Sequence, residues 1–399
     1  MVQGRNFLTD AEGTFKFKPN SVNSFNWNYS ITLDIDDVEA LNYIHKTLGV
    51  GTVYLSNKYP RASFEVSSQQ ELRIILAIFA RYNLNSAKHL NYLDFCKAFL
   101  LYTKDSGREY RSKLKPILLD ILSSMNNSRT NFNLTANRKL HITSNWLLGF
   151  VEGDGSFSYA RGNGKLLLII IQKGDLPLFN AIRDFLVDLA KEYNVINNLD
   201  IDENAINIYS NRTGISRLEV SRSDFLKHIL IPLFNSLTFH TKKYLDYCDW
   251  VALFNIRQSG FHYLPEGQKL IDRISSQMNN NRLSTSPDFG LKTQKSDSAQ
   301  SKLVNRAELI ADINKLLSMP SNYEHKQDGR TWIKSECKYM WDVKSTVVEL
   351  IYPDGIIETF HSQTDCAKFL GVSRPTVSLR LVKSRSFLFQ NKVCRLKLK

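Results

Sequence analysis

Two acidic residues, Glu12 and Asp154, occupy matching positions in two similar stretches of the chain. Glu12 lies in FLTDAEGTF (7–15) and Asp154 in LLGFVEGDGSF (147–157), and each is followed by Gly, a hydroxyl residue and Phe. Two nearby carboxylates repel each other unless a cation neutralises them, so the pair predicts a divalent-cation site. Mg²⁺ suits oxygen ligands, and bound metals can activate water and stabilise the leaving oxygen of a phosphodiester. The alternative is that each acid only ends a turn at the surface.

A lysine recurs at matching positions further along: Lys88 in NSAKHLNY and Lys243 in HTKKYLDY, with Lys242 as the alternative to Lys243. A lysine beside the carboxylates could stabilise phosphate charge or orient a water molecule. The alternative is a solvated surface lysine, but the repeated placement favours a role in the site.

The elements that must position these residues repeat as well. Residues 1–112 and 144–258 each read helix, hairpin, helix, hairpin, helix. Such an internal duplication predicts two pseudo-symmetric αββαββα halves with one site between them. Gly149 and Gly153 would let the acidic helices pack backbone to backbone, which would bring the two carboxylates together at the bottom of a cleft.

LLGFVEGDGSF closely resembles the LAGLIDADG motif, and FLTDAEGTF resembles a weaker second copy. The resemblance implies an α+β fold with saddle-shaped antiparallel sheets and a single-chain homing endonuclease that cuts double-stranded DNA. It also implies that Glu12 and Asp154 hold Mg²⁺ or another divalent cation. Lys88, Lys243 and Gln172 then complete the catalytic set, with Gln172 positioning a water molecule. The alternative for Gln172 is that it is only a polar residue at the end of a strand.

Four acidic residues near these positions are expected to have other roles. Asp10 and Glu152 lie two residues before the metal-binding acids, and we expect them to support the structure. Asp34 and Asp36 lie where the first half has no counterpart of Gln172, and we expect them at the surface or at a helix start.

The first motif has Phe7 where the family has a small residue. A bulky side chain at a close helix crossing would force the helices apart. Together with the missing glutamine, this leaves a second hypothesis open, in which the chain is a group I intron RNA maturase with weak or lost cleavage.

We expect the sheets to read DNA, because alternate side chains of a strand point to the same face. The candidates in both halves are polar or basic residues of the strands and their turns: Lys16, Lys18, Asn28, Ser56, Lys58, Ser158, Arg161, Lys165, Ser210, Arg212, Arg217 and Arg222.

The remaining segments differ in composition. Residues 113–143 are predicted to be a polar linker, and 259–340 a connector, flexible around 276–302, with a helix near 305–318. Residues 341–399 contain SQTDCAKFLGVSRPTVSLRL, which predicts a helix–turn–helix. The segment resembles the modular repeat often appended to intron-encoded nucleases. Its predicted DNA-facing residues are Arg374, Thr376, Ser378 and Arg380.

The bulk properties agree with a nucleic-acid partner. The 399 residues carry a net charge of +13 and a pI near 9.3, which favours polyanions. Five scattered cysteines argue against a disulfide framework or a zinc site. The sequence predicts no membrane span and no transit peptide, and its Asn, Ile and Lys content suits an organelle-encoded, mitochondrial protein. Because one chain carries both motifs, we expect it to act as a monomer. A transcription regulator has less support, because it leaves the paired acidic motifs unexplained.

Overall fold

The structure is a computed structural model that describes most of the chain. The described residues are 7–21, 24–132, 139–197, 201, 203–279, 282, 305–326, 330–340, 347–360, 362–383, 386–390 and 392–398. They form two compact units. We call residues 1–258 with 266–318 the motif unit, and residues 259–265 with 319–399 the C-terminal unit. In the described part of the chain, no helix has the length and apolarity that a membrane span needs.

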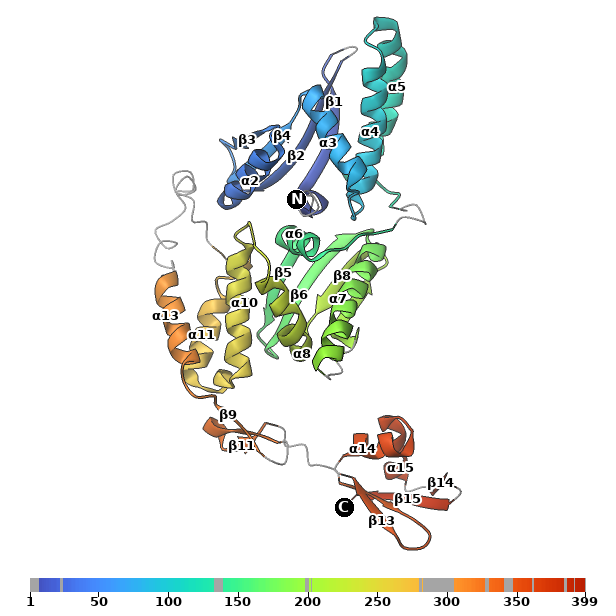
Figure 1. Ribbon diagram of the computed structural model, residues 1–399, viewed down its shortest axis with the longest axis vertical. Helices are drawn as coiled ribbons and strands as arrows, with labels where there is room; N and C mark the ends of the chain where they lie inside the picture. Colours follow the sequence, from blue (N-terminus) through green and yellow to red (C-terminus); the bar gives the residue numbers. More distant parts are fainter. Residues whose placement is uncertain are drawn as a thin grey trace. The chain divides into compact units, whose positions relative to one another are not determined.

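The first half of the motif unit contains a four-stranded antiparallel sheet in the order β1-β2-β4-β3. Helices α2, α3 and α4 cover one face of this sheet (Figure 1). Its elements are α1 (Phe7–Glu12), β1 (Gly13–Pro19), β2 (Phe25–Asp34), α2 (Val38–Leu48), β3 (Thr52–Leu55), β4 (Arg61–Val66), α3 (Gln69–Arg81), α4 (Lys88–Lys104) and α5 (Arg108–Ser123).

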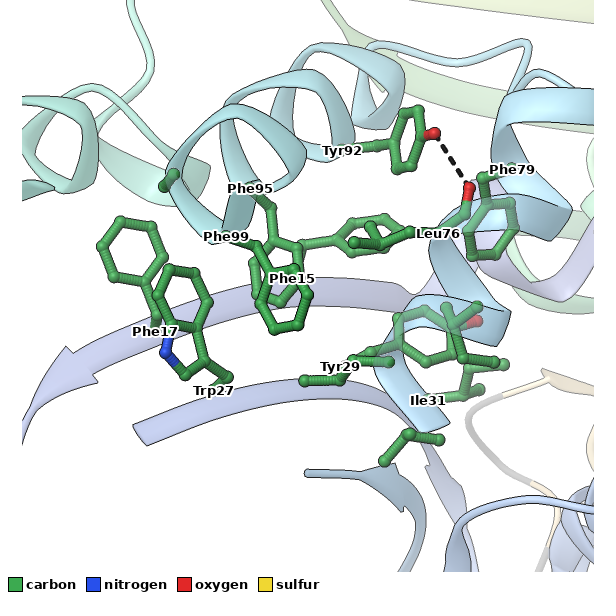
Figure 2. Close-up of a cluster of buried hydrophobic side chains, with 14 of the residues drawn as sticks. Phe15, Phe17, Trp27, Tyr29, Ile31, Leu76, Phe79, Tyr92, Phe95 and Phe99 are labelled. Atoms are coloured by element: carbon green, nitrogen blue, oxygen red, sulfur yellow. Dashed lines mark hydrogen bonds between the residues drawn. The ribbon is translucent and has the colours of Figure 1, made fainter. Parts of the chain in front are cut away.

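Burial alternates along the strands and so fixes which face is covered. In β1, Phe15 and Phe17 are buried whereas Lys16 and Lys18 are exposed. Figure 2 shows the inward side chains of β1 and β2 packed against aromatic residues of the helices. The ring centroids of Phe15 and Phe95 lie 5.6 Å apart. Removing this apolar surface from water stabilises the half and leaves the polar face of the sheet free.

The second half repeats the arrangement with the sheet order β5-β6-β8-β7. The registers correspond, since Gly13 pairs with Ile31 in one half and Gly155 with Ile170 in the other. Two αββαββα-type halves are therefore confirmed. The elements are α6 (Ser144–Asp154), β5 (Gly155–Ala160), β6 (Lys165–Lys173), α7 (Leu176–Asn197), β7 (Ile206–Ser210), β8 (Ile215–Val220), α8 (Ser223–Phe225), α9 (Ile231–Asn235) and α10 (Lys243–Gln258).

The two halves meet where α1 crosses α6. A Cβ atom added at Gly153 would lie 2.3 Å from the Cβ atom of Ala11, so only a glycine fits at this point. The backbones are thus as close as the motif predicts. The side chain of Phe7, which we expected to force the helices apart, lies outside the described residues.

The segments outside the two repeats are more structured than their composition suggests. Helix α5 runs through the position where we expected a linker to begin, because its apolar residues Leu114, Leu118 and Ile121 pack into the first core. Helices α11 (Pro265–Ser275) and α13 (Arg306–Leu317) follow the second half, and α13 confirms the helix predicted near 305–318. Most of the stretch 276–302 lies outside the described residues.

The C-terminal unit contains a three-stranded sheet and a four-stranded sheet with the strand order β13-β12-β15-β14. The predicted pair of helices is present, and Gly371 makes the turn between them with φ of 65°. The elements are β9 (Tyr323–His325), β10 (Thr331–Ile333), β11 (Lys338–Tyr339), β12 (Val348–Ile351), β13 (Ile357–Phe360), α14 (Gln363–Leu370), α15 (Arg374–Lys383), β14 (Phe387–Phe389) and β15 (Lys392–Leu398).

We predict that Gly153→Ala destabilises the motif unit, because the new methyl group would overlap Ala11 at the helix crossing. Overpacking of this kind typically costs about 1–3 kcal/mol. Urea unfolding of the full chain measures the loss. Gly162→Ala is the matched control, since nothing lies within 4 Å of a Cβ atom built there. Equal stability of the two variants would contradict the close crossing.

Candidate active site between the two motif helices

The two motif carboxylates come together because the helices that carry them end side by side. Glu12 is the last residue of α1 and Asp154 the last residue of α6. Burial raises the pKa of Asp154 to about 7; the Lys88 ammonium opposes this shift and the negative charge of Glu12 adds to it. The pair expected from the sequence is thus a pair in space, contributed by both halves.

Gln172 contacts Asp154 directly, whereas Glu12 has no equivalent partner among the residues that the structure describes. The Gln172 amide nitrogen donates a hydrogen bond to Asp154 Oδ2. By the strand registers, the position that corresponds to Gln172 in the first half is Leu33, which is buried. The carboxylates therefore differ in their surroundings, and the expected inequivalence of the half-sites is visible in the side chains.

Each predicted lysine is the first residue of a helix. Lys88 starts α4 and its Nζ donates to the carbonyl oxygen of Ala11, while Lys243 starts α10 and its Nζ donates to that of Gly155 at 2.8 Å. Burial lowers the pKa of both ammonium groups. They hold the chain at the ends of the motif helices, next to the carboxylates.

Lys242, the alternative to Lys243, has a different position. Its Nζ lies 3.1 Å from Asp34 Oδ1 and 3.4 Å from Asp36 Oδ2, across the boundary between the halves. Asp34 also accepts a hydrogen bond from the backbone of Asp36 and so caps a short helical turn, as expected for a helix-start acid.

Asp10 and Glu152 hold the segments that precede the lysines. Asp10 accepts hydrogen bonds from the backbone N–H groups of Asn85 at 3.0 Å and Ser86 at 2.7 Å. Glu152 accepts from His240 at 2.6 Å and Thr241 at 2.7 Å, and also from the Thr241 hydroxyl. Both acids are buried. Their contacts agree with a supporting role.

Two further aspartates, which the sequence analysis did not single out, reach across to the opposite half. Asp175 follows β6 and accepts a hydrogen bond from Ala87 N at 3.0 Å. Asp37 follows β2 and accepts one from Lys242 N at 2.6 Å. Each lysine-bearing helix is therefore capped from both halves, and each carboxylate also faces the positive end of a helix dipole.

Two clefts flank the carboxylates. One, of about 1010 Å³, is lined by Glu12, Lys243, Arg61 and Arg282, and we call it the Lys243 half-site. The other, of about 760 Å³, is lined by Lys88, Gln172, Lys16, Lys173 and Arg129, and we call it the Lys88 half-site. The Lys88 half-site is lined by four basic and two acidic residues and the Lys243 half-site by four basic and five acidic residues, so each cleft places basic side chains next to carboxylates.

The candidate DNA-reading residues lie in three kinds of place. Those on the open faces of the sheets are Lys16, Lys18, Asn28, Ser158, Lys165 and Arg217. Those in turns or after a strand are Ser56, Lys58, Arg161, Arg212 and Arg222. Ser210 is exposed at the end of β7, where its hydroxyl oxygen lies 2.8 Å from that of Ser216.

Several of these basic groups already have acidic or aromatic partners. Arg217 Nη2 lies 2.5 Å from Glu219 Oε1, and Arg222 forms an ion pair with Asp224. In the C-terminal unit the Arg380 guanidinium stacks 3.9 Å from the ring centroid of Phe387, whereas Arg374 at the start of α15 is exposed.

The family model described as "LAGLIDADG endonuclease" matches residues 8–99 and 147–254, which together make up half of the chain. The chain belongs to the LAGLIDADG endonuclease family. The two matched ranges are the two halves of the motif unit, so the duplicated motif, the fold and the family agree.

Two curated proteins resemble this LAGLIDADG chain. It is 25% identical over 288 residues to "Uncharacterized mitochondrial protein RF1" of Saccharomyces cerevisiae, covering 69% of this chain and 59% of that protein. It is 27% identical over 189 residues to "Probable intron-encoded endonuclease Cox1-I1b" of Schizosaccharomyces pombe, covering 45% and 47%. The chain thus spans about half the length of the curated relatives that it matches.

Solved structures share the fold of the motif unit. The LAGLIDADG homing endonuclease I-GzeII, solved in complex with its DNA target, is 25% identical with a TM-score of 0.58, covering 71% of this chain and 98% of that one. I-SmaMI, bound to an uncleaved DNA target in the presence of calcium ions, is 23% identical with a TM-score of 0.57, covering 70% of this chain and 99% of that one. At this identity, the similarity to I-SmaMI shows that the two chains share a fold and no more.

We predict that Glu152→Ala weakens the folded state, because it leaves the His240 and Thr241 donors without their acceptor. A buried donor that loses its partner costs about 1–3 kcal/mol. The free energy of unfolding in urea measures the effect. Asp188→Ala, on the exposed face of α7, is the control and should stay within about 0.5 kcal/mol of wild type. If Glu152→Ala were as stable as that control, the supporting role of Glu152 would be contradicted.

Proposed function

We propose that this LAGLIDADG chain is a site-specific endonuclease that hydrolyses both strands of a long double-stranded DNA site with a divalent cation. The observation that carries the proposal is the meeting of Glu12 and Asp154, one from each half, at the crossing of α1 and α6. DNA-bound solved relatives and an intron-encoded curated relative support it. Cleavage would start intron homing.

The carboxylate pair suits a divalent cation. Burial and mutual repulsion both raise the pKa of Asp154, so an ionised pair needs a compensating positive charge. Glu12 and Asp154 would hold Mg²⁺ or a similar ion, since LAGLIDADG endonucleases use divalent metal ions and such hard cations prefer oxygen ligands. A cation bound there would lower the pKa of a water molecule and stabilise charge on the scissile phosphate.

The neighbouring side chains of this chain would orient the reactants. Lys88 and Lys243 bring positive charge to the two clefts, where it would stabilise the phosphate as negative charge develops. The Gln172 amide holds Asp154 in one orientation and would also direct a water molecule in the Lys88 half-site. Placing these groups in advance spares the cost of arranging them during the reaction.

The polar sheet faces would bind the DNA. Lys16 and Lys18 alternate with buried phenylalanines and so project from the open face, where they can reach phosphates or base edges. The excess charge of +13 would draw the chain to a polyanion. In the C-terminal unit, the helix pair α14 and α15 would add contacts through Arg374, Thr376 and Ser378.

A second candidate function is that of an RNA maturase for a group I intron. The observation that favours it is Leu33, which stands where a second glutamine would complete the half-site of Glu12. Such a protein would bind the intron RNA through its basic surface with little or no DNA cleavage.

We further propose that the protein works in mitochondria and acts as a monomer. A curated relative is named as mitochondrial and another as intron-encoded. Both halves of the site come from one chain, so no second copy is needed to bring the carboxylates together.

The cleavage test uses the intronless allele of the host gene as substrate, with Mg²⁺ and with EDTA. We predict Mg²⁺-dependent cutting of both strands by the wild type, and a loss of at least about 10²-fold in Asp154→Asn and in Glu12→Gln, because a lost metal ligand removes charge stabilisation. DNA binding in Ca²⁺ serves as the control for folding. Tight DNA binding without any cutting, together with rescue of intron splicing, would favour the maturase.

We predict that Arg374→Ala in the C-terminal unit weakens DNA binding about equally on all sequences and reduces the slope of log affinity against log salt by about 1, as expected when one phosphate contact is lost. Lys113→Ala, on the exposed face of α5, is the like-charged control. Fluorescence anisotropy over a salt series measures both. An unchanged slope in Arg374→Ala would remove this residue from the DNA interface.

A further inference from the structure

A short sequence recurs after each half, in stretches whose composition had indicated only linkers. It reads SSMNNSR in 123–129 and SQMNNNR in 276–282, so both copies share the pattern Ser-x-Met-Asn-Asn-x-Arg. Both methionines, Met125 and Met278, are buried. The first asparagine of each copy has a left-handed backbone, with φ of 53° and 55°. Two copies with the same unusual conformation indicate a shared role.

The first copy joins two elements of the Lys88 half-site. The Asn126 side chain donates to the carbonyl oxygen of Phe15 at 2.9 Å, on the strand that begins directly after Glu12. The Asn126 backbone N–H donates to Asn91 Oδ1 at 2.9 Å, and Asn91 lies one turn after Lys88 on α4. Arg129 donates to the same Asn91 oxygen and forms an ion pair with Asp94.

The second copy makes the same contacts in the Lys243 half-site. The Asn279 side chain donates to the carbonyl oxygen of Phe157 at 2.9 Å, on the strand that begins directly after Asp154. Its backbone N–H donates to Asp246 Oδ1 at 3.0 Å, one turn after Lys243 on α10. Arg282 contacts Asp246 at 2.7 Å and Asp249 at 2.6 Å.

These contacts connect the strand that follows each carboxylate to the helix that carries each lysine. Both copies also line a cleft, with Asn126 and Arg129 in the Lys88 half-site and Asn279 and Arg282 in the Lys243 half-site. Arg129 and Arg282 are each only 9% exposed at the side chain, so they are fixed by their acceptors rather than free for solvent.

We propose that the two Ser-x-Met-Asn-Asn-x-Arg segments are paired positioning elements, each of which sets the lysine of its own half-site against the scissile phosphate of one DNA strand. The proposal rests on the endonuclease function above. Because the hydrogen bonds of Asn126 and Asn279 in the described part of the chain join the strand and the helix of one half-site each, the loss of one segment should slow the cutting of one DNA strand more than the other. A general structural role would slow both strands alike.

The chain supplies its own matched pair of variants, Asn126→Gly and Asn279→Gly. Glycine accepts the left-handed backbone at both positions and removes the side-chain amide, which at Asn279 also accepts a hydrogen bond from Ser156 Oγ at 3.3 Å. The substrate is the intronless allele with a different fluorophore at each 5′ end, and single-turnover rates are measured at saturating protein in Mg²⁺. Binding in Ca²⁺ and the urea midpoint are measured on the same samples.

We expect each variant to slow the cutting of one DNA strand by about tenfold relative to the cutting of the other strand, which is the usual effect of one lost hydrogen bond on a rate. The two variants should slow opposite strands, with DNA binding unchanged. Arg129→Lys and Arg282→Lys, which keep the charge and lose the fork of donors, should show the same strand preference more weakly.

Other outcomes overturn the proposal. If both variants slow both strands equally, slow the same strand, or leave both rates unchanged, the segments have only a structural role or none. If the wild type binds the DNA site and cuts neither strand, the endonuclease function itself is refuted. If the wild type cuts and the variants show no strand preference, only the positioning role is refuted.

Discussion

The crossing of α1 and α6 is the contact on which the rest of the motif unit depends. The backbones approach so closely at Ala11 and Gly153 that a methyl group on the glycine would overlap its neighbour. Both helices end at this point in a carboxylate, and both continue directly into the first strand of a sheet. One close contact therefore sets the spacing of the acids and the placement of the two polar sheet faces.

Around this crossing, buried acids fix the starts of the lysine-bearing helices through hydrogen bonds. Asp10 and Glu152 hold the start of these helices from within the motif, and Asp175 and Asp37 hold it from the opposite half. Each carboxylate accepts backbone hydrogen bonds at a helix start, where a negative charge is favourable. The lysines are thus held by contacts that join the two halves.

The sequence was enough to predict the duplicated halves, the acid pair and both lysines, because each rests on a local pattern that recurs at the same place in the chain. It did not identify Asp37 or Asp175, whose partners lie in the other half and depend on tertiary packing. The two Ser-x-Met-Asn-Asn-x-Arg segments were present in the sequence, but their polar composition led us to interpret them as parts of linkers.

The central claim is that Glu12 and Asp154 form one composite cation site. The most direct test is a crystal structure of the chain with its DNA site and Mn²⁺, read from the anomalous signal of the ion. The account predicts anomalous peaks with oxygens of both carboxylates at about 2.1 Å, the bond length of small octahedral cations. Peaks that contact neither carboxylate, or carboxylates that lie too far apart to share the site, would contradict it.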